Sequence, residues 1–230
     1  MKLSIIIPCK NEEKYIGKLF NSLQNQSLPF EFEIIVADAG STDKTCFIIE
    51  AYKAILPIKR IQGGLPSIGR NNGARVANGE ILLFLDADTN FDDSELINES
   101  IKKIDNGSEL VGALLNIKQN LFVRCLYFMT NIVIRLSKLE KPFVVGAYFM
   151  ITKEAFDRLG GFDESLMHCE DYFLSKQIAN KKFSIIKKYI YTDDRRFKKM
   201  GKIGMVKYFF NNVLKRNNKN VFKKDIGYWS

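Results

Sequence analysis

The stretch from Ile81 to Asp88, ILLFLDAD, decides the class of fold that this chain adopts. Its run of apolar residues, Ile81 to Leu85, is typical of a strand that is buried on both faces of a parallel sheet. Two aspartates, Asp86 and Asp88, follow at the carboxyl end of that strand. Because ligands of open α/β sheets bind beyond the carboxyl ends of the strands, the same stretch predicts a binding site.

The residues before this stretch alternate between short apolar runs and amphipathic segments. The apolar runs predict strands, and apolar residues at helical spacing predict helices, the first with Asn11 as its N-cap. The strands are expected at 3–8, 32–37, 58–62 and 81–85, and the helices at 11–26, 43–53 and 67–77. Such alternation indicates a parallel sheet with right-handed crossovers.

The second half of the chain is more mixed. Strands are expected at 110–117, 143–151 and 183–191, and helices at 121–138, 153–159 and 170–179. Because no linker or repeat interrupts the sequence, we expect one domain over residues 1–194 and a basic, amphipathic C-terminal appendage over 195–230. The predicted fold class is α/β, with a Rossmann-like, mixed and mostly parallel sheet flanked by helices.

The composition excludes some classes of protein. The 230 residues are 46% hydrophobic, which is enough for a sizeable core and excludes wholesale disorder. Lys and Arg number 35 against 26 Asp and Glu, for a net charge of +9. Residues 195–230 hold eleven of the basic residues and one acid, Asp225, whereas the rest of the chain is nearly neutral. A charge argument for nucleic-acid binding therefore applies to the appendage alone.

The cysteines and the hydropathy pattern bear on location. Cys9, Cys46, Cys125 and Cys169 are far apart and the chain has one histidine, so no Cys/His zinc site is expected. Free thiols indicate a reducing compartment, and we expect a cytoplasmic protein. The N-terminal apolar run is too short for a signal peptide, and no apolar stretch of about 18 residues predicts a membrane-spanning helix.

Asp86 and Asp88 are candidate metal ligands. In an extended chain, residues two apart point the same way, so both carboxylates are expected to face one small volume. Their like charges need a compensating cation, and hard oxygen ligands suit Mn2+ or Mg2+, which usually also bind substrate phosphates. The alternative is a solvated turn. The phosphatase nucleophile motif DxDx[TV] does not fit, because Thr89 follows Asp88 directly and Asn90 stands next.

Three further positions carry polar groups suited to a site. Asp38 ends a strand, where its carboxylate could accept N–H bonds from a planar base or cap the next helix. Arg70 lies early in a helix, where it could clamp a diphosphate or simply face solvent. Glu170 and Asp171 open a helix whose dipole keeps them ionised, so Asp171 could act as a general base or merely complement the dipole.

Taken together, these residues carry a resemblance. The motifs are IIIPCKNEE at 5–13, IIVADAGSTDKT at 34–45, RNNGARVANGEILLFLDADT at 70–89, GAYFMITKEAFDRLGGFDE at 146–164 and HCEDYFLSKQ at 168–177. Over residues 3 to about 180 the chain resembles a family-2 glycosyltransferase of the GT-A fold, in the nucleotide-diphospho-sugar transferase superfamily. Each motif is modest alone, but their order and spacing are specific.

The resemblance implies a donor side. Its expected residues are Pro8 and Glu12 lining the nucleoside pocket, Asp38 holding N3–H of a uracil-type base, Arg70 near the base or diphosphate, Asp86 contacting the ribose or the metal, and Asp88 ligating the metal. Ala39 replaces an acid that is common in the family, so one donor contact is in doubt. The QxxRW motif of processive synthases is missing; Arg195 and Arg196 stand roughly in its place and could close over the diphosphate.

The resemblance also implies an acceptor side. Asp171 would deprotonate the acceptor hydroxyl, and one base without a covalent intermediate predicts inversion at the anomeric carbon. Glu170, the 160–164 turn, and Gly146, Ala147 and Tyr148 would shape the acceptor side. His168, next to the acidic pair, is a minor candidate, since a lone histidine is usually structural.

The implied function is transfer of a sugar from a nucleotide-sugar, with UDP favoured, to a saccharide or a lipid-linked acceptor, as in the synthesis of a cell-envelope polysaccharide. A polyprenyl-phosphate sugar synthase that uses a GDP-sugar is the alternative. A non-catalytic module that binds nucleic acid through the basic tail is another, but it leaves the acidic strand ends unexplained.

Two amphipathic segments raise the question of a membrane. Residues 203–216 and 121–138 combine apolar residues at helical spacing with flanking Lys and Arg, and Tyr228 and Trp229 could add an interfacial anchor. Peripheral binding to an anionic membrane surface and packing of the stripes on the domain are both open at this point.

Overall fold

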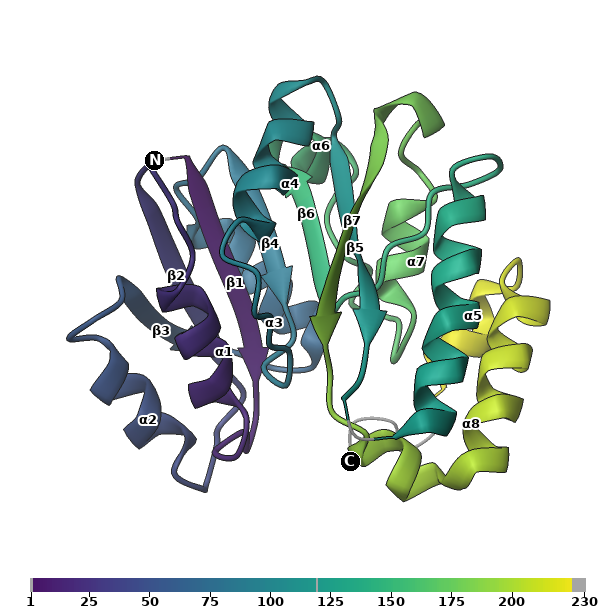
Figure 1. The fold of residues 1–230 in the computed structure, drawn as a ribbon, viewed down its shortest axis with the longest axis horizontal. Helices are drawn as coiled ribbons and strands as arrows, with labels where there is room; N and C mark the ends of the chain where they lie inside the picture. The colour runs from purple at the N-terminus through teal and green to yellow at the C-terminus, as the bar shows by residue number, and fades with distance from the viewer. Residues whose placement is uncertain (1, 119, 225–230) are drawn as a thin grey trace.

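The computed structural model describes residues 2–118 and 120–224. The predictions for Arg196, Tyr228 and Trp229 concern side chains that lie outside this description. A seven-stranded sheet in the order β3-β2-β1-β4-β6-β5-β7 forms the centre (Figure 1). Its strands are β1 Leu3–Cys9, β2 Phe32–Asp38, β3 Ile58–Gln62, β4 Ile81–Leu85, β5 Leu110–Asn116, β6 Tyr148–Thr152 and β7 Phe183–Tyr191. β6 is antiparallel to β4 and β5, and the other pairs are parallel, which confirms the mixed, mostly parallel α/β sheet.

Helices cover both faces of the sheet. They are α1 Ile16–Gln24, α2 Thr45–Tyr52, α3 Pro66–Val76, α4 Leu96–Asp105, α5 Leu121–Ser137, α6 Lys153–Arg158, α7 Glu170–Ser175 and α8 Arg195–Lys215, with 3-10 turns η1 Asn180–Lys182 and η2 Lys219–Lys223. Alternate residues of β1 show the two layers. Ile5 packs in a core with Phe20 of α1 and Ile97 of α4, whereas Ile6 packs in the opposite core with Ala74 of α3 and Phe156 of α6.

α3 lies unusually close to the sheet. A Cβ placed on Gly73 would come within 2.4 Å of Ile6 Cγ2, so glycine is required for this approach. The close packing fixes the start of α3 beside the carboxyl ends of β1 and β4, where the predicted site lies.

Two sequence-predicted starts were wrong, and one helix was missed. The first helix begins at Ile16 and not at Asn11, because Asn11 has a φ of +55° and its side chain accepts a hydrogen bond from Thr42 N at 2.8 Å. The strand expected from 143 begins only at Tyr148. α4 was not predicted, although its buried residues, among them Leu96, Ile97 and Ile101, carry a readable helical spacing.

α8 lies beside α5 at one edge of the molecule (Figure 1). It is two helices joined at Gly201, whose φ of +70° and ψ of 163° are not helical. Phe197 of α8 packs with Val123 of α5 and Ile117, and Met205 packs against this cluster, so at least one residue of the amphipathic segment predicted at 203–216 contacts the domain. Within the described ranges, the helices are too short or too polar for any of them to cross a bilayer.

Candidate functional site

Two pockets meet at the carboxyl end of β4. The β1-side pocket has a volume of about 550 Å³, and the α5–α8 pocket has a volume of about 440 Å³. Asp86 and Asp88 line both pockets. The other residues of the β1-side pocket include Pro8, Cys9, Lys10, Glu12, Ala39, Gly64, Leu65, Pro66, Arg195 and Lys199. The paired carboxylates are therefore the shared wall of two cavities, as the strand-end argument requires.

The two aspartates reach one volume by a turn and not by an extended chain. Thr89 N donates to Asp86 O at 3.0 Å, which closes a turn over Asp86 to Thr89. Both side chains face the junction, as expected, but the reason given for it, an extended chain, was wrong. Asp86 Oδ1 lies 2.6 Å from Arg70 Nη2, and Asp88 Oδ2 lies 3.1 Å from Arg195 Nη2. Each carboxylate is therefore held by a different arginine.

Arg70 is a buried bridge. Its guanidinium donates to Asp86 and to Glu170 and lies over the Phe162 ring, with 5.5 Å between the guanidinium carbon and the ring centroid. Against the effect of burial, the charges of Asp86 and Glu170 raise the pKa of Arg70. Because two carboxylates of the protein hold this guanidinium and its side chain is 2% exposed, the expected diphosphate clamp is replaced by a positioning role.

Asp171 lies on the other side of this bridge, in the α5–α8 pocket. Its Oδ2 accepts from Gly146 N at 2.6 Å, and its Oδ1 accepts from Tyr172 N at 2.7 Å. Enclosure by the protein, and then the charge of Glu170, raise the pKa of Asp171 to about 7, although Arg70 and the two N–H donors oppose that shift. A carboxylate poised near neutrality is suited to accept a proton.

The predicted acceptor-side residues divide into two groups. Gly146, Ala147 and Glu170 line the α5–α8 pocket. Tyr148 does not, and its assignment was wrong. It is fully buried as the first residue of β6, and its hydroxyl is 2.8 Å from Ser100 Oγ of α4, so its side chain lies in the core that α4 covers.

The 160–164 turn also lies away from both pockets. The Asn71 side chain donates to Phe162 O at 2.8 Å and accepts from Phe162 N at 3.0 Å, which fixes the turn on α3. Glu164 Oε1 lies 3.0 Å from Nη2 of Arg75, which, like Asn71, belongs to α3. Through the Phe162 ring, the turn therefore packs against the Arg70 guanidinium. It does not line the α5–α8 pocket, where the acceptor side was expected.

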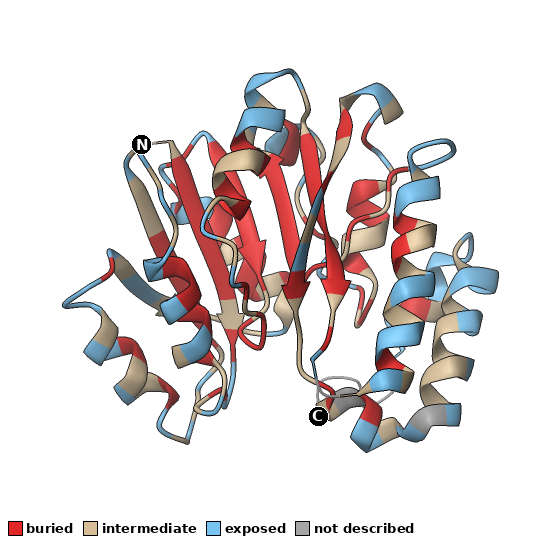
Figure 2. Cartoon of the chain, viewed as in Figure 1, coloured by how far each residue is buried: buried red, intermediate tan, exposed pale blue. Residues whose placement is uncertain are grey.

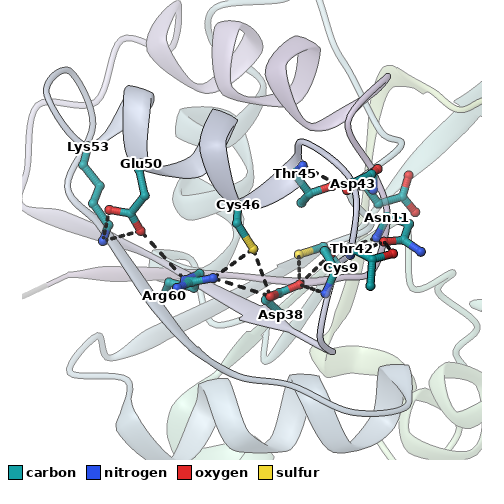
Figure 3. A network of polar contacts seen from close by, with 12 residues as sticks. Cys9, Asn11, Asp38, Thr42, Asp43, Thr45, Cys46, Glu50, Lys53 and Arg60 are labelled. Atoms are coloured by element: carbon teal, nitrogen blue, oxygen red, sulfur yellow. Dashed lines mark hydrogen bonds and ion pairs between the residues drawn. The ribbon is translucent and has the colours of Figure 1, made fainter.

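Asp38 is enclosed in a polar network at the end of β2 (Figure 3). Its Oδ1 accepts from Ser41 N at 3.1 Å and Ser41 Oγ at 2.6 Å, and its Oδ2 accepts from Cys46 Sγ at 3.3 Å. Arg60 Nη1 is 3.7 Å from the same oxygen. Burial, followed by the charge of Asp38, raises the pKa of the Cys9 thiol. Asp38 holds the loop whose next residue, Ala39, lines the β1-side pocket.

Arg195, the first residue of α8, forms part of the wall of the β1-side pocket. It donates to both oxygens of Glu12 at 2.7 Å, and it also reaches Asp88. Pro8 and Glu12 line this pocket as predicted, and so does Arg195. Sequence reasoning missed Lys10 and Lys199, which lie in the same pocket. No local pattern distinguishes either lysine from others, because surface lysines are common.

His168 lines neither pocket. Its ring packs 5.2 Å from the Phe222 ring and 5.7 Å from the Tyr208 ring, and burial lowers its pKa. These contacts support the structural role.

The α5–α8 pocket has an apolar wall that is formed by the two amphipathic segments of the sequence. Tyr127, Val133 and Leu136 of α5 face Phe197, Met205, Phe209 and Val213 of α8 across it. The signal was present as the two amphipathic stripes, but nothing in the sequence indicated that they form one cavity.

The carboxylates fit a divalent cation that a substrate helps to bind. Among the described residues no cluster of three or more His, Cys, Asp or Glu side chains forms a complete metal site. Mn2+ and Mg2+ are usually held by one or two carboxylates together with substrate phosphates. Asp86 and Asp88 at the junction of two pockets are such a partial set.

The mixed, mostly parallel seven-stranded sheet with helices on both faces matches the GT-A class of fold. The chain belongs to glycosyltransferase family 2, because the family model described as "Glycosyl transferase family 2" matches residues 4–160. The resemblance read from the motifs is thereby confirmed.

Known proteins agree with this assignment. Over 93 residues, 38% of this chain and 16% of the relative, the chain is 45% identical to the Staphylococcus aureus poly(ribitol-phosphate) beta-N-acetylglucosaminyltransferase TarS. It is 32% identical over 114 residues to a Pyrococcus furiosus dolichol-phosphate mannosyltransferase, covering 48% of this chain and 32% of that one. The chain thus spans less than a third of the length of either relative.

Solved structures show the same fold. The structure of S. aureus TarS 1-349 in complex with UDP-GlcNAc superposes with a TM-score of 0.64 at 27% identity, over 84% of this chain and 58% of that chain. The mannosyltransferase PcManGT from Pyrobaculum calidifontis, in complex with GDP-Man and Mn2+, superposes with a TM-score of 0.69 at 19% identity, over 90% of this chain and 64% of that chain.

Proposed function

We propose that the chain is a metal-dependent, inverting glycosyltransferase that moves a sugar from a nucleoside diphosphate, with UDP favoured, to an acceptor hydroxyl. One observation carries the proposal. Asp86 and Asp88 form the wall between two pockets, and a carboxylate with a pKa of about 7, Asp171, lies in one of them. The β1-side pocket takes the nucleotide, and the α5–α8 pocket takes the acceptor.

Asp86 and Asp88 would hold the cation, Mn2+ or Mg2+, at the junction. When bound, such a cation neutralises negative charge that develops on the departing diphosphate. Pro8 and Ala39 line the nucleoside end of the pocket, and Asp38 fixes the loop there. The uridine preference rests on the family resemblance at Asp38 and on the similarity to TarS, whose structure was solved with UDP-GlcNAc.

Asp171 acts on the acceptor. Each of its oxygens accepts one backbone N–H bond and retains a second lone pair, so it can take the proton of an acceptor hydroxyl. The hydroxyl oxygen forms a bond to the anomeric carbon as the bond from that carbon to the diphosphate breaks. Attack from the face opposite the leaving group inverts the configuration, as in an inverting glycosidase with a sugar hydroxyl in place of water.

The acceptor has an apolar part. The α5–α8 pocket places apolar side chains such as Leu136, Phe209 and Val213 next to the acidic groups. A saccharide alone gains little from such a wall, whereas a lipid-linked acceptor buries its chain there. The Pyrococcus furiosus relative, whose name gives dolichol phosphate, supports this choice.

The same helices present apolar side chains outward, which supports peripheral binding to an anionic membrane. Leu139 beyond α5 and Leu214 of α8 are 81% and 78% exposed. Figure 2 shows both helices mostly in the colours of exposed and intermediate residues. Described residues 195–224 hold no acid to offset their Lys and Arg, so the edge favours anionic lipid.

The test is incubation with a panel of UDP- and GDP-sugars and Mn2+, in separate reactions with a lipid-linked saccharide, which offers hydroxyls, and with a short-chain polyprenyl phosphate, with detection of the released nucleotide. We expect release from a UDP-sugar that requires Mn2+ and stops with EDTA. Release from a GDP-sugar alone would favour the polyprenyl-phosphate synthase alternative. Thermal stabilisation by an oligonucleotide, and not by UDP with Mn2+, would instead support the nucleic-acid-binding module.

A further inference from the structure

Arg195 sits where the donor's cation is needed. Its guanidinium makes a bidentate pair with Glu12, with both N···O distances at 2.7 Å, and its Nη2 is 3.1 Å from Asp88 Oδ2. Its guanidinium carbon is also 5.0 Å from the centroid of the Tyr15 ring. The carboxylates of Glu12 and Asp88 are only 10% and 7% exposed, and Arg195 forms an ion pair with both.

A divalent cation and this arginine compete for the same carboxylate. Arg195 stays charged at any pH at which the protein is folded. A metal ion binds a carboxylate oxygen at about 2.1 Å, which would bring it against the guanidinium that already lies on Asp88. Two cations at one oxygen repel strongly in a partly buried site. Entry of the metal therefore requires Arg195 to leave Asp88.

The segment that carries Arg195 has a hinge. Gly201 interrupts α8 with a φ of +70° and a ψ of 163°, a conformation that residues other than glycine rarely adopt, and it separates residues 195–200 from 202–215. The short segment contributes to both pockets. Arg195 lies in the β1-side pocket, and Phe197 lies in the α5–α8 pocket, where its ring is 5.9 Å from the Tyr127 ring.

We propose that residues 195–200 form a cation-operated lid, a proposal that rests on the proposed metal-dependent function. Arg195 holds the lid on Glu12 and Asp88 in the absence of donor, and the cation displaces it. Because Phe197 is two residues away on the same short helix, its displacement changes the wall of the acceptor pocket.

The first test measures Mn2+ binding without nucleotide, by electron paramagnetic resonance of free Mn2+. Arg195→Ala removes the competing cation, so we expect its affinity for Mn2+ to rise about fivefold or more over the wild type. Arg195→Lys keeps the charge but loses the bidentate fork, so an intermediate affinity is expected. Lys198→Ala is the matched control, because it removes one charge from the same helical turn while its partner is Asp194.

The second test needs no variant. Hydrogen exchange of the backbone amides of 195–201, followed by mass spectrometry in the wild-type protein, should become faster on addition of Mn2+ alone. Equal Mn2+ affinity of wild type and Arg195→Ala, or unchanged exchange in protein that has bound Mn2+, would overturn the lid while leaving the proposed function intact. Failure of the wild type to bind UDP with Mn2+ would overturn the proposed function itself, and the lid with it.

Discussion

Arg70 Nη2 lies 2.6 Å from Asp86 Oδ1, and the other terminal nitrogen of the same guanidinium bonds Glu170, so one buried arginine joins the carboxylate that ends β4 to the acidic start of α7. Arg70 therefore connects Asp86, at the junction of the two pockets, to the helix that carries Asp171, the proposed base. Arg70 neutralises charge that would otherwise accumulate where the two pockets meet.

Replacement of Arg70 should be costly to stability. Arg70→Met leaves Asp86 and Glu170 without their buried partner, and an uncompensated buried charge typically costs about 3–5 kcal/mol. Urea denaturation would measure the loss. Arg75→Met is the control on the same helix, since Arg75 and its partner Glu164 are exposed and such a pair contributes less than about 1 kcal/mol. Equal losses in the two variants would contradict the bridging role.

Gly146 is the contact point between the bridge and the base. A Cβ added there would lie 2.7 Å from Arg70 Nη2 and 3.5 Å from Asp171 Oδ2. Because Arg70 is enclosed, Gly146→Ala should shift the arginine and Asp171, and we expect transfer to fall about 10²-fold while UDP binding persists. In Gly204→Ala the nearest atom is Met200 Cβ at 3.5 Å, an ordinary contact, so that variant should keep its activity.

The sequence predicted the parts of this site that depend on local pattern. The strand ends that carry Asp38 and Asp86 followed from apolar runs, and Asp171 followed from an acidic helix start. The pairings could not be predicted, because Arg70 meets Glu170 across 100 residues and Arg195 meets Glu12 across 183. Such contacts depend on the order of strands in the sheet, which no local periodicity encodes.

Tyr148 shows the same limit on a smaller scale. It was assigned to the site because it adjoins Gly146 and Ala147 in one motif. β6 begins at Tyr148, so its side chain follows the alternation of a strand and enters the core toward Ser100. The expected strand, 143–151, already contained Tyr148, but the assignment followed the motif and not the alternation of side chains along that strand.

The rate of transfer should depend on Asp171 in its ionised form. Burial and Glu170 raise its pKa to about 7, so the proton-accepting form increases as the pH rises through that value. We therefore expect kcat to increase about tenfold per pH unit below 7 and to level off above it. Asp171→Asn should lower kcat by about 10²–10⁴-fold above pH 7, where the wild-type carboxylate is ionised, by less at pH 5, and leave UDP binding unchanged. A flat profile between pH 5 and 8 in the wild type would rule out this assignment.

The same carboxyl group should make stability depend on pH. In the unfolded chain Asp171 has a pKa near 3.8, whereas in the folded protein its pKa is about 7, so between these values the folded state binds more protons. Its favourable contribution is complete below pH 3.8 and is lost as the pH rises toward 7. Asp171→Asn does not titrate, but it loses one of the two backbone N–H bonds that the carboxylate accepts. Its melting temperature relative to that of the wild type should therefore be more favourable at pH 8 than at pH 5. Calorimetry at the two values would measure this, and a difference that is the same at both would contradict it.

The exposed edge of α5 and α8 should bind anionic vesicles. Leu139 and Leu214 are 81% and 78% exposed among flanking lysines and arginines, so their insertion adds apolar burial to electrostatic attraction. We expect the wild type to float with phosphatidylglycerol vesicles at low salt and to release as salt rises. Leu139→Glu combined with Leu214→Glu should reduce binding at least about tenfold, because each change replaces roughly 1.5–3 kcal/mol of burial with a charge that the lipid repels.

The matched control for that experiment is Phe47→Glu. Phe47 of α2 is 75% exposed, so it is as apolar and as accessible as the two leucines, but it lies on the opposite side of the molecule from α5 and α8 (Figure 1). A membrane surface confined to α5 and α8 predicts that Phe47→Glu floats like the wild type. Equal loss in the two variants would mean that any exposed apolar residue contributes, and wild-type protein that stays at the bottom of the gradient with anionic vesicles would remove membrane binding from the proposed function.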